Sequence, residues 1–214
     1  MVEPVARFEE IEIPLAEPVH ELTSVKGILG IPEWWPTGSR VSVVLAHGKE
    51  AEDPLLEGLQ KSLTECKFLT LRFRFPFVEA SKSRVDSTAV LQRTFRAAVA
   101  VLGRDPTAAP AHLFIGGKNI GAEAAAQAAA ARMRVDGVFF LGYPLHKLGS
   151  TKALRDDPLY RVISPALFVQ GTRDRHCDLD ALRKVLKKSA RTAEDVEAEV
   201  LTALHDWIVK VLGE

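Results

Sequence analysis

The residues whose types and spacing most clearly suggest chemistry are Gly117, Asn119 and Gly121. They stand between the apolar segment 112–115 and the alanine-rich run 122–131, which predicts a buried strand, a sharp turn and a helix. Proteins that hold a nucleophilic serine on such a turn use the spacing G-x-S-x-G, because small neighbours let the backbone bend without a clash. Here the central residue is asparagine, whose amide has no ionisable oxygen to attack a carbonyl carbon. Asn119 could instead hydrogen-bond a ligand at the helix N-terminus, or serve only as a turn residue.

Other polar residues follow two later apolar segments. Tyr143 and His146 follow the segment 138–141 and either line a pocket or belong to a chain reversal at Pro144. A second polar group surrounds Asp174 and consists of Arg173, His176, Cys177, Asp178 and Asp180. Adjacent residues on one turn rarely converge on a common point, and no second ligand group stands at a recognised spacing, so no metal site or cysteine nucleophile is predicted. His47, before Gly48, is interpreted as a residue that orients its loop.

The composition restricts the class of protein. A chain of 214 residues fits one domain over 1–214, and its 28 basic residues balance its 28 acidic ones, which argues against a nucleic-acid partner. The apolar runs are shorter than the ~18–20 residues needed to span a bilayer, and the acidic N-terminus does not resemble a signal peptide. Two cysteines far apart in sequence predict neither a disulfide framework nor a zinc site. We therefore expect a cytoplasmic protein without a metal or cofactor and without membrane association.

Short β-branched or aromatic segments alternate with longer helical ones, which predicts an α/β fold with a mainly parallel sheet and helices on both faces. The first two strands are expected to form an antiparallel hairpin. The expected strands are 8–13, 22–31, 41–46, 68–75, 112–115, 138–141 and 166–170. The expected helices are 53–65, 88–102, 120–133, 157–161 and 178–188, with a polar loop over 76–87.

The last segment has a strong helical period. Apolar residues recur at Val196, Val200, Leu204, Trp207 and Val211, which predicts one amphipathic helix from Val196 to Leu212. Thr192 with Asp195 three residues later resembles a capping box at its start.

Five segments in this order resemble the α/β-hydrolase fold over essentially the whole chain. More narrowly, they resemble the dienelactone-hydrolase-related group that includes testis-expressed protein 30 and the hydrolase-like domain of NSL-complex subunit 3. Each segment stands at the carboxyl end of an expected strand, where open α/β sheets place their sites. The segments are Leu45–Gly48, Leu71–Phe77, Gly116–Gly121, Leu141–His146 and Val169–Asp174.

The resemblance implies a Ser-Asp-His triad, with Asn119 at the nucleophile position and Asp174 at the acid position. It also implies an oxyanion hole from the N–H of Ile120 and the loop after Gly48, where Lys49 stands in place of the usual small residue. The family's histidine follows one further strand. No such strand or histidine loop is recognisable after Asp174, so both are predicted to be missing.

His205 is the only weak candidate for the missing base, 31 positions after Asp174. The helical period runs through it without a break, which favours a packing or surface role. Loss of an edge strand would uncover backbone groups and the apolar face of the last helix, and it predicts a homodimer or marginal stability.

Two functions remain open. The first is a hydrolase scaffold with a degenerate triad, inactive or binding a small acyl or ester ligand. The alternative is an active esterase or lactone hydrolase that uses an unconventional site around Asp174 and His205, or water as the nucleophile. A purely structural subunit is a third interpretation.

Overall fold

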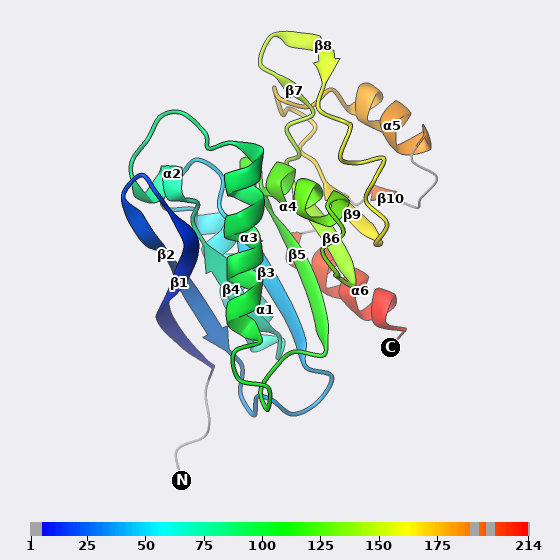
Figure 1. Ribbon diagram of the computed structural model, residues 1–214. Helices are drawn as coiled ribbons and strands as arrows, with labels where there is room; N and C mark the ends of the chain where they lie inside the picture. Colours follow the sequence, from blue (N-terminus) through cyan, green and yellow to red (C-terminus); the bar gives the residue numbers. More distant parts are fainter. Residues whose placement is uncertain (1–5, 189–192, 196–199, 214) are drawn as a thin grey trace.

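The main sheet has eight strands in the order β1-β2-β4-β3-β5-β6-β9-β10 (Figure 1). The computed structural model describes residues 6–188, 193–195 and 200–213. The strands β1 and β2 form an antiparallel hairpin, β2 pairs antiparallel with β4, and all later neighbours are parallel. The predicted fold class and N-terminal hairpin are therefore confirmed. The strands are β1 (Arg7–Val19), β2 (Leu22–Ile31), β3 (Val41–Ala46), β4 (Leu69–Phe73), β5 (His112–Lys118), β6 (Gly137–Leu141), β9 (Ala166–Val169) and β10 (Ala193–Asp195).

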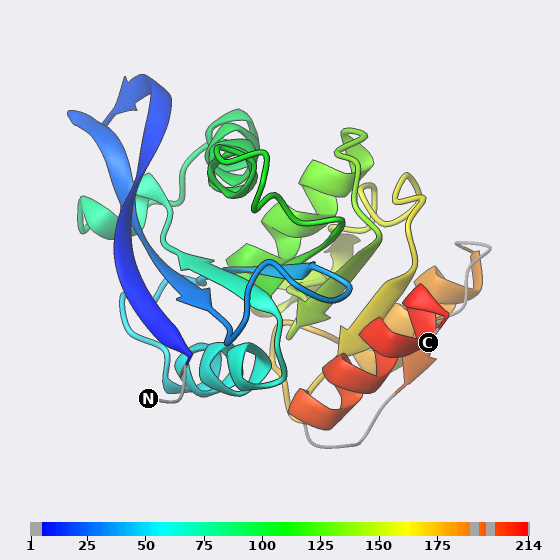
Figure 2. The ribbon, with the colours of Figure 1, turned by 90° about the horizontal axis from the view of Figure 1, so that it is seen from below.

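Helices cover both faces of this sheet, as Figure 2 shows from below. One face carries α1 (Pro54–Glu65) and α6 (Val200–Leu212), which contact each other, and the other carries α3 (Thr88–Leu102) and α4 (Ile120–Ala130). The remaining elements lie at the carboxyl end of the sheet (Figure 1): α2 (Pro76–Glu79), α5 (Leu179–Lys188) and the small hairpin β7 (His146–Lys147) and β8 (Ser150–Leu154).

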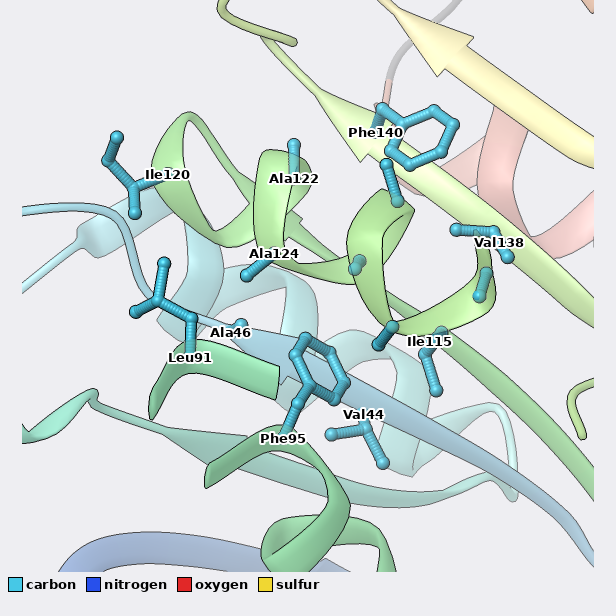
Figure 3. Packing of buried hydrophobic residues seen from close by; sticks show 14 of the residues in the cluster. Val44, Ala46, Leu91, Phe95, Ile115, Ile120, Ala122, Ala124, Val138 and Phe140 are labelled. Atoms are coloured by element: carbon cyan, nitrogen blue, oxygen red, sulfur yellow. The ribbon is translucent and has the colours of Figure 1, made fainter. Parts of the chain in front are cut away.

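The hydrophobic core consists of one cluster on each face of the sheet. On the α3–α4 face, Phe95 and Ile115 are fully buried beside a row of buried alanines from α4 (Figure 3). Alanine side chains let a helix approach the sheet closely, and the turn before α4 depends on that approach. On the other face, Trp207 of α6 packs edge-on against Phe114 of β5 with ring centroids 5.5 Å apart.

The end of the sheet differs from the sequence-based prediction. The last strand is present: Ala193–Asp195 forms β10 and pairs in parallel with Ala166–Phe168 of β9. The prediction that this strand is missing is wrong, although the strand has only three residues. The pairing satisfies backbone groups of β9 that would otherwise form an open edge, and this tertiary contact outweighs the local helical period.

The last helix is correspondingly shorter than expected and begins at Val200. Asp195 lies in a strand, so the predicted capping box does not start a helix, while Thr192 and Val196 lie outside the described residues. Because β10 covers part of the edge of β9, the argument for a homodimer loses its main support. The dimer stays a prediction.

Smaller differences from the sequence-based prediction concern the segments that connect strands and helices. The expected helix at 157–161 is a turn, and the expected polar loop at 76–87 begins with the helical turn α2. Strand β5 continues to Lys118 and α4 begins at Ile120, which places the strand-to-helix turn at a single residue, Asn119. Helix α4 ends at Ala130, earlier than expected. Within the described ranges, no helix combines the length and apolar character required to cross a membrane.

Candidate active site

Asn119 alone connects β5 to α4, and its backbone is in a strained conformation with φ 53° and ψ −110°. The neighbouring glycines make this turn possible. A Cβ atom on Gly117 would lie 2.4 Å from the carbonyl oxygen of Ala46, and one on Gly121 would lie 2.2 Å from the same oxygen. These distances are far below van der Waals contact, so both positions require glycine. The turn therefore has the backbone geometry expected of a nucleophile elbow, with asparagine at its centre.

Hydrogen bonds fix the elbow on both sides. The Asn119 N–H donates to the carbonyl of Leu141 (3.0 Å), and the Asn119 carbonyl accepts from the N–H of Glu123 (3.0 Å). The side-chain amide of Asn119 makes no hydrogen bond within the described part of the chain, although the residue is half-buried. Ile120 is the first residue of α4, where a backbone N–H has no acceptor within the helix. The elbow therefore offers an unused amide beside a free backbone donor.

The loop after β3 lies against this turn. A Cβ atom on Gly48 would lie 3.6 Å from the Cβ of Asn119 and 3.2 Å from the carbonyl oxygen of Lys118. Lys49 is exposed. Gly48, Asn119 and Ile120 thus come together, as the resemblance implies for an oxyanion hole.

His47 holds this loop in place. Its ring is buried, with Nδ1 3.2 Å from the carbonyl oxygen of Glu50. Arg72 donates from Nη1 to the Nε2 atom of His47 (3.0 Å), so Nε2 is the acceptor and Nδ1 carries the hydrogen. Burial and the adjacent Arg72 lower the pKa of His47 to about 4. His47 is therefore a neutral ring that orients its loop.

An ion pair that the sequence analysis missed supports the elbow from below. The Nζ atom of Lys118 lies 2.6 Å from Asp53 Oδ2, and the other oxygen of Asp53 accepts N–H bonds from the first turn of α1. The sequence shows Asp53 as a helix-capping candidate before Pro54. It gives no sign that Lys118 is its partner, because 65 residues separate them.

Asp174 lies at the same end of the sheet as the elbow, beside Gly142, which follows β6. A Cβ atom on Gly142 would lie 3.5 Å from Asp174 Oδ2. That oxygen accepts a hydrogen bond from Gln170 Nε2 (2.7 Å), and Oδ1 accepts from the backbone N–H of His176 (2.8 Å). Gln170 also accepts from the N–H of Tyr143 (2.8 Å). The Gln170 amide therefore hydrogen-bonds the Asp174 carboxylate. Gln170 lies in the segment Val169–Asp174 that carries the resemblance, but no role for its side chain could be inferred from the sequence.

Tyr143 and His146 both have structural partners. Tyr143 is fully buried, its hydroxyl donates to the carbonyl of Arg155 (2.7 Å), and burial raises its pKa. The Nε2 atom of His146 accepts from the N–H of Asp178 (3.1 Å), which leaves Nδ1 to donate to the Lys147 carbonyl (3.0 Å). His146 therefore connects the β7–β8 hairpin to the loop that carries Asp174.

A shallow cavity of about 560 Å³ lies beside Asp174, and its lining includes His146 and Cys177. Burial, together with the carboxylate of Asp174, raises the pKa of the Cys177 thiol to about 12. The thiol is therefore protonated at neutral pH and is a poor nucleophile. Within the described ranges, no three His, Cys, Asp or Glu side chains are grouped so that they could hold a metal ion.

His205 is not brought to this site. Its ring stacks on Phe68 with centroids 5.7 Å apart, and its Nδ1 lies 3.2 Å from Asp206. Phe68 precedes the first residue of β4, so this contact is at the amino end of the parallel strands. Asn119 and Asp174 follow the carboxyl ends of β5 and β9. The structure thus places Asn119, Gly48, Ile120 and Asp174 at one end of the sheet and His205 at the other.

A glycine-flanked strained turn after the central strand, with an acidic loop two strands away, is the arrangement found in α/β hydrolases. The family model described as the alpha/beta hydrolase domain matches residues 39–210, and the chain belongs to this family. Among solved structures, it is similar to a dienelactone hydrolase from Anabaena variabilis, at 20% identity, with 97% of each chain covered and a TM-score of 0.70.

Two further structures show the same fold. Est1E from Butyrivibrio proteoclasticus has a TM-score of 0.74 at 13% identity, with 96% of this chain and 99% of that chain covered. XC6422 from Xanthomonas campestris, described as an α/β serine hydrolase without a lid, has a TM-score of 0.69 at 19% identity, with 98% and 96% covered. The fold is thus of the dienelactone-hydrolase type. The narrower resemblance to testis-expressed protein 30 and NSL-complex subunit 3 stays a prediction.

Proposed function

We propose that this protein is an α/β-hydrolase family member that has lost serine chemistry and binds a small acyl or ester ligand at the elbow. The observation that carries the proposal is the residue at the turn: Asn119 holds the strained backbone of a nucleophile but presents an unpaired amide. The amide can donate to a ligand oxygen and accept from a ligand donor, while the adjacent Ile120 N–H can bind a carbonyl oxygen.

The surrounding groups support binding rather than hydrolysis. An ester hydrolase of this type needs a base with a free lone pair next to the nucleophile. The two buried histidines near the strand ends both use Nε2 to accept a hydrogen bond, from Arg72 to His47 and from Asp178 to His146. Both oxygens of Asp174 also accept hydrogen bonds, from Gln170 and from the His176 N–H. Within the described residues, neither imidazole is available to activate a nucleophile at Asn119.

The alternative is an esterase or lactone hydrolase that activates water. The observation in its favour is the intact elbow: the glycine contacts, the free N–H of Ile120 and the loop at Gly48 could still stabilise an oxyanion. This route does not need Asn119 as a nucleophile.

Hydrolysis of short p-nitrophenyl esters and simple lactones separates the two functions. We expect rates equal to buffer for the unmodified chain, for Asp174→Asn and for His205→Ala. Asn119→Ser should recover little, because a base is still missing. Saturable turnover by the unmodified chain that falls in Asp174→Asn would establish the hydrolase and overturn the proposal.

Ligand binding is tested with methyl butyrate by NMR titration. Asn119→Gly is the informative variant, because glycine accepts the positive φ at this position while the amide is removed. We expect binding to weaken about fivefold, the loss of roughly one hydrogen bond. Arg84→Gln, at an exposed position in the α2–α3 connection, is the matched control and should bind like the unmodified chain. Equal affinity in Asn119→Gly would exclude the elbow as the binding site.

A further inference from the structure

A second cavity, of about 540 Å³, lies at the opposite end of the sheet. Three separate segments form it: the start of β5 (111–113), the α4–β6 connection (132–136) and the segment before β9 (163–164). Since these strands are parallel, the segments meet at the amino ends of the strands, whereas the elbow follows the carboxyl end of β5. We call this cavity the arginine pocket. No part of the proposed function uses it.

The wall of the arginine pocket is largely apolar. Leu113, Met133 and Val135 contribute half-buried side chains, and Ile163 contributes one that is 70% exposed. An isoleucine left this open to water forfeits most of the free energy that its burial would give. The volume of the pocket falls within the range of about 300–1,000 Å³ that is usual for small-ligand sites.

Two arginines add positive charge to this wall. Neither Arg132 nor Arg134 forms an ion pair or a side-chain hydrogen bond with any residue in the described ranges, and both are exposed. Among the described residues of the lining, only Asp136 is acidic, and its oxygens are already engaged. Asp136 Oδ2 accepts from the N–H of Leu113 (2.8 Å), and Oδ1 lies 3.4 Å from Nδ1 of His112. The two guanidinium groups thus remain available for an anion.

The fold does not require an arginine at position 132. The end of α4 is closed by backbone bonds from Arg132 to Ala129 (3.0 Å) and from Met133 to Ala128 (3.2 Å), a pattern in which the residue with positive φ is usually glycine. Arg132 takes this place with φ 60°. Arg96 already supplies a cation at this end, because its Nη2 donates to the carbonyl of Ala131 (3.2 Å). A glycine would satisfy the helix end better, so the side chain of Arg132 is explained by something other than the helix.

We propose that the arginine pocket binds a small amphipathic anion. Its carboxylate or phosphate-monoester head would bind the guanidinium groups of Arg132 and Arg134, whose planar donors match such oxyanions. Its short apolar chain would cover Ile163 and lie along Leu113 and Met133. The ligand class is set by this combination of two unpaired cations with an open apolar wall.

Isothermal titration with octanoate, octyl phosphate and octan-1-ol tests the proposal. We expect saturable binding of at least one of the two anions, and the comparison between them identifies the head group. Octan-1-ol has the same chain without charge and should bind about tenfold more weakly or not at all. Acetate has the charge without the chain and should not saturate. Equal binding of octanoate, octyl phosphate and octan-1-ol, or no binding of either anion, would overturn the proposal.

Variants then locate the site. Arg132→Gly removes the guanidinium and relieves the positive φ, so it should lower anion affinity about fivefold or more without lowering the melting temperature. Arg134→Gln and Ile163→Ser should also weaken binding, through the head group and the chain respectively. Arg84→Gln, the same kind of change at an exposed site elsewhere, serves as the control. If the anions bind with unchanged affinity in Arg132→Gly and Arg134→Gln, they bind elsewhere and the assignment is wrong. Ester binding at the elbow should be unaffected, so failure here leaves the proposed function untouched.

Discussion

The elbow at Asn119 and the loop that carries Asp174 lie at the same end of the sheet, but the surrounding structure fixes the elbow more rigidly. We call the second segment the acid loop. At the elbow, two glycines meet the same carbonyl oxygen of Ala46, and a central strand on either side fixes the backbone. The acid loop follows a strand of four residues, β9, and beyond it the sheet ends in a strand of three, β10. The backbone of the elbow is fixed because it is part of the core. The side chains of Asn119 and Asp174 stand at strand ends, where a replacement would leave the core intact.

The largest effect on this comparison is expected from a side chain added at the elbow. Gly121→Ala would place a methyl group 2.2 Å from a backbone oxygen that cannot move without displacing β3, so we expect a loss of more than about 3 kcal/mol in the free energy of unfolding. Gly58→Ala is the matched control, because that glycine is at an exposed position of α1 with nothing within 4 Å of the added Cβ. It should stabilise the protein by about 0.5–1 kcal/mol. Denaturant unfolding measures both, and similar stabilities for the two variants would mean that the elbow is loosely packed.

The support of the elbow should also be sensitive to pH. The pKa of His47 is lowered from 6.5 to about 4 in the folded protein, so the folded state holds the ring neutral while the unfolded chain binds a proton. Stability is therefore expected to fall as the pH drops from 6.5 towards 4, by about 3 kcal/mol for this residue.

The measurement is urea unfolding at several pH values, for the unmodified chain and for His47→Gln. Glutamine keeps a donor and an acceptor but does not titrate in this range. The difference in stability between the two proteins should shrink as the pH falls. A constant difference would show that His47 is protonated without cost.

In the acid loop, we expect Gln170 to make the largest contribution of any single side chain to the stability of the protein. Gln170→Ala removes the donor to Asp174 and the acceptor for the Tyr143 N–H, and it should cost about 1–2 kcal/mol of stability. Thr172→Ala, two residues away and exposed, should change stability by less than about 0.5 kcal/mol. Thermal unfolding of the two variants tests this. If Gln170→Ala is as mild as Thr172→Ala, the network around Asp174 is not structural.

Much of the fold could be predicted from sequence, for identifiable reasons. A central strand is buried on both faces and therefore has an almost wholly apolar sequence, so segments such as Val41–Ala46 could be recognised as strands. All six residues of this strand are buried in the structure. The elbow was predictable because close contact with Ala46 requires glycine at both Gly117 and Gly121, which leaves a fixed glycine spacing in the sequence. Both signals lie within a few consecutive residues.

What the sequence did not reveal depends on distant contacts. Strand β10 has three residues and no alternating pattern, and it exists because β9 offers a partner. The Lys118–Asp53 pair and the role of Gln170 join residues that no local pattern connects. His205 has the right sequence interval from Asp174, yet its helix carries it to the amino end of the sheet, against Phe68. An interval in sequence does not determine which end of a sheet a side chain reaches.

The longest strand of the molecule, β1, has consequences for how copies of the protein meet in concentrated solution. It lies at the rim of the sheet and pairs on one side only, with β2. Its sequence carries Pro14 and Pro18, which lack the donor needed to template another strand, and the exposed glutamates Glu9, Glu10 and Glu12. If two copies approached through their β1 edges, the prolines would face backbone groups with which they cannot pair, and carboxylates would face carboxylates. We therefore expect the strand that completes the sheet to hinder edge-to-edge pairing of copies, and we expect this effect to weaken as salt screens the carboxylates.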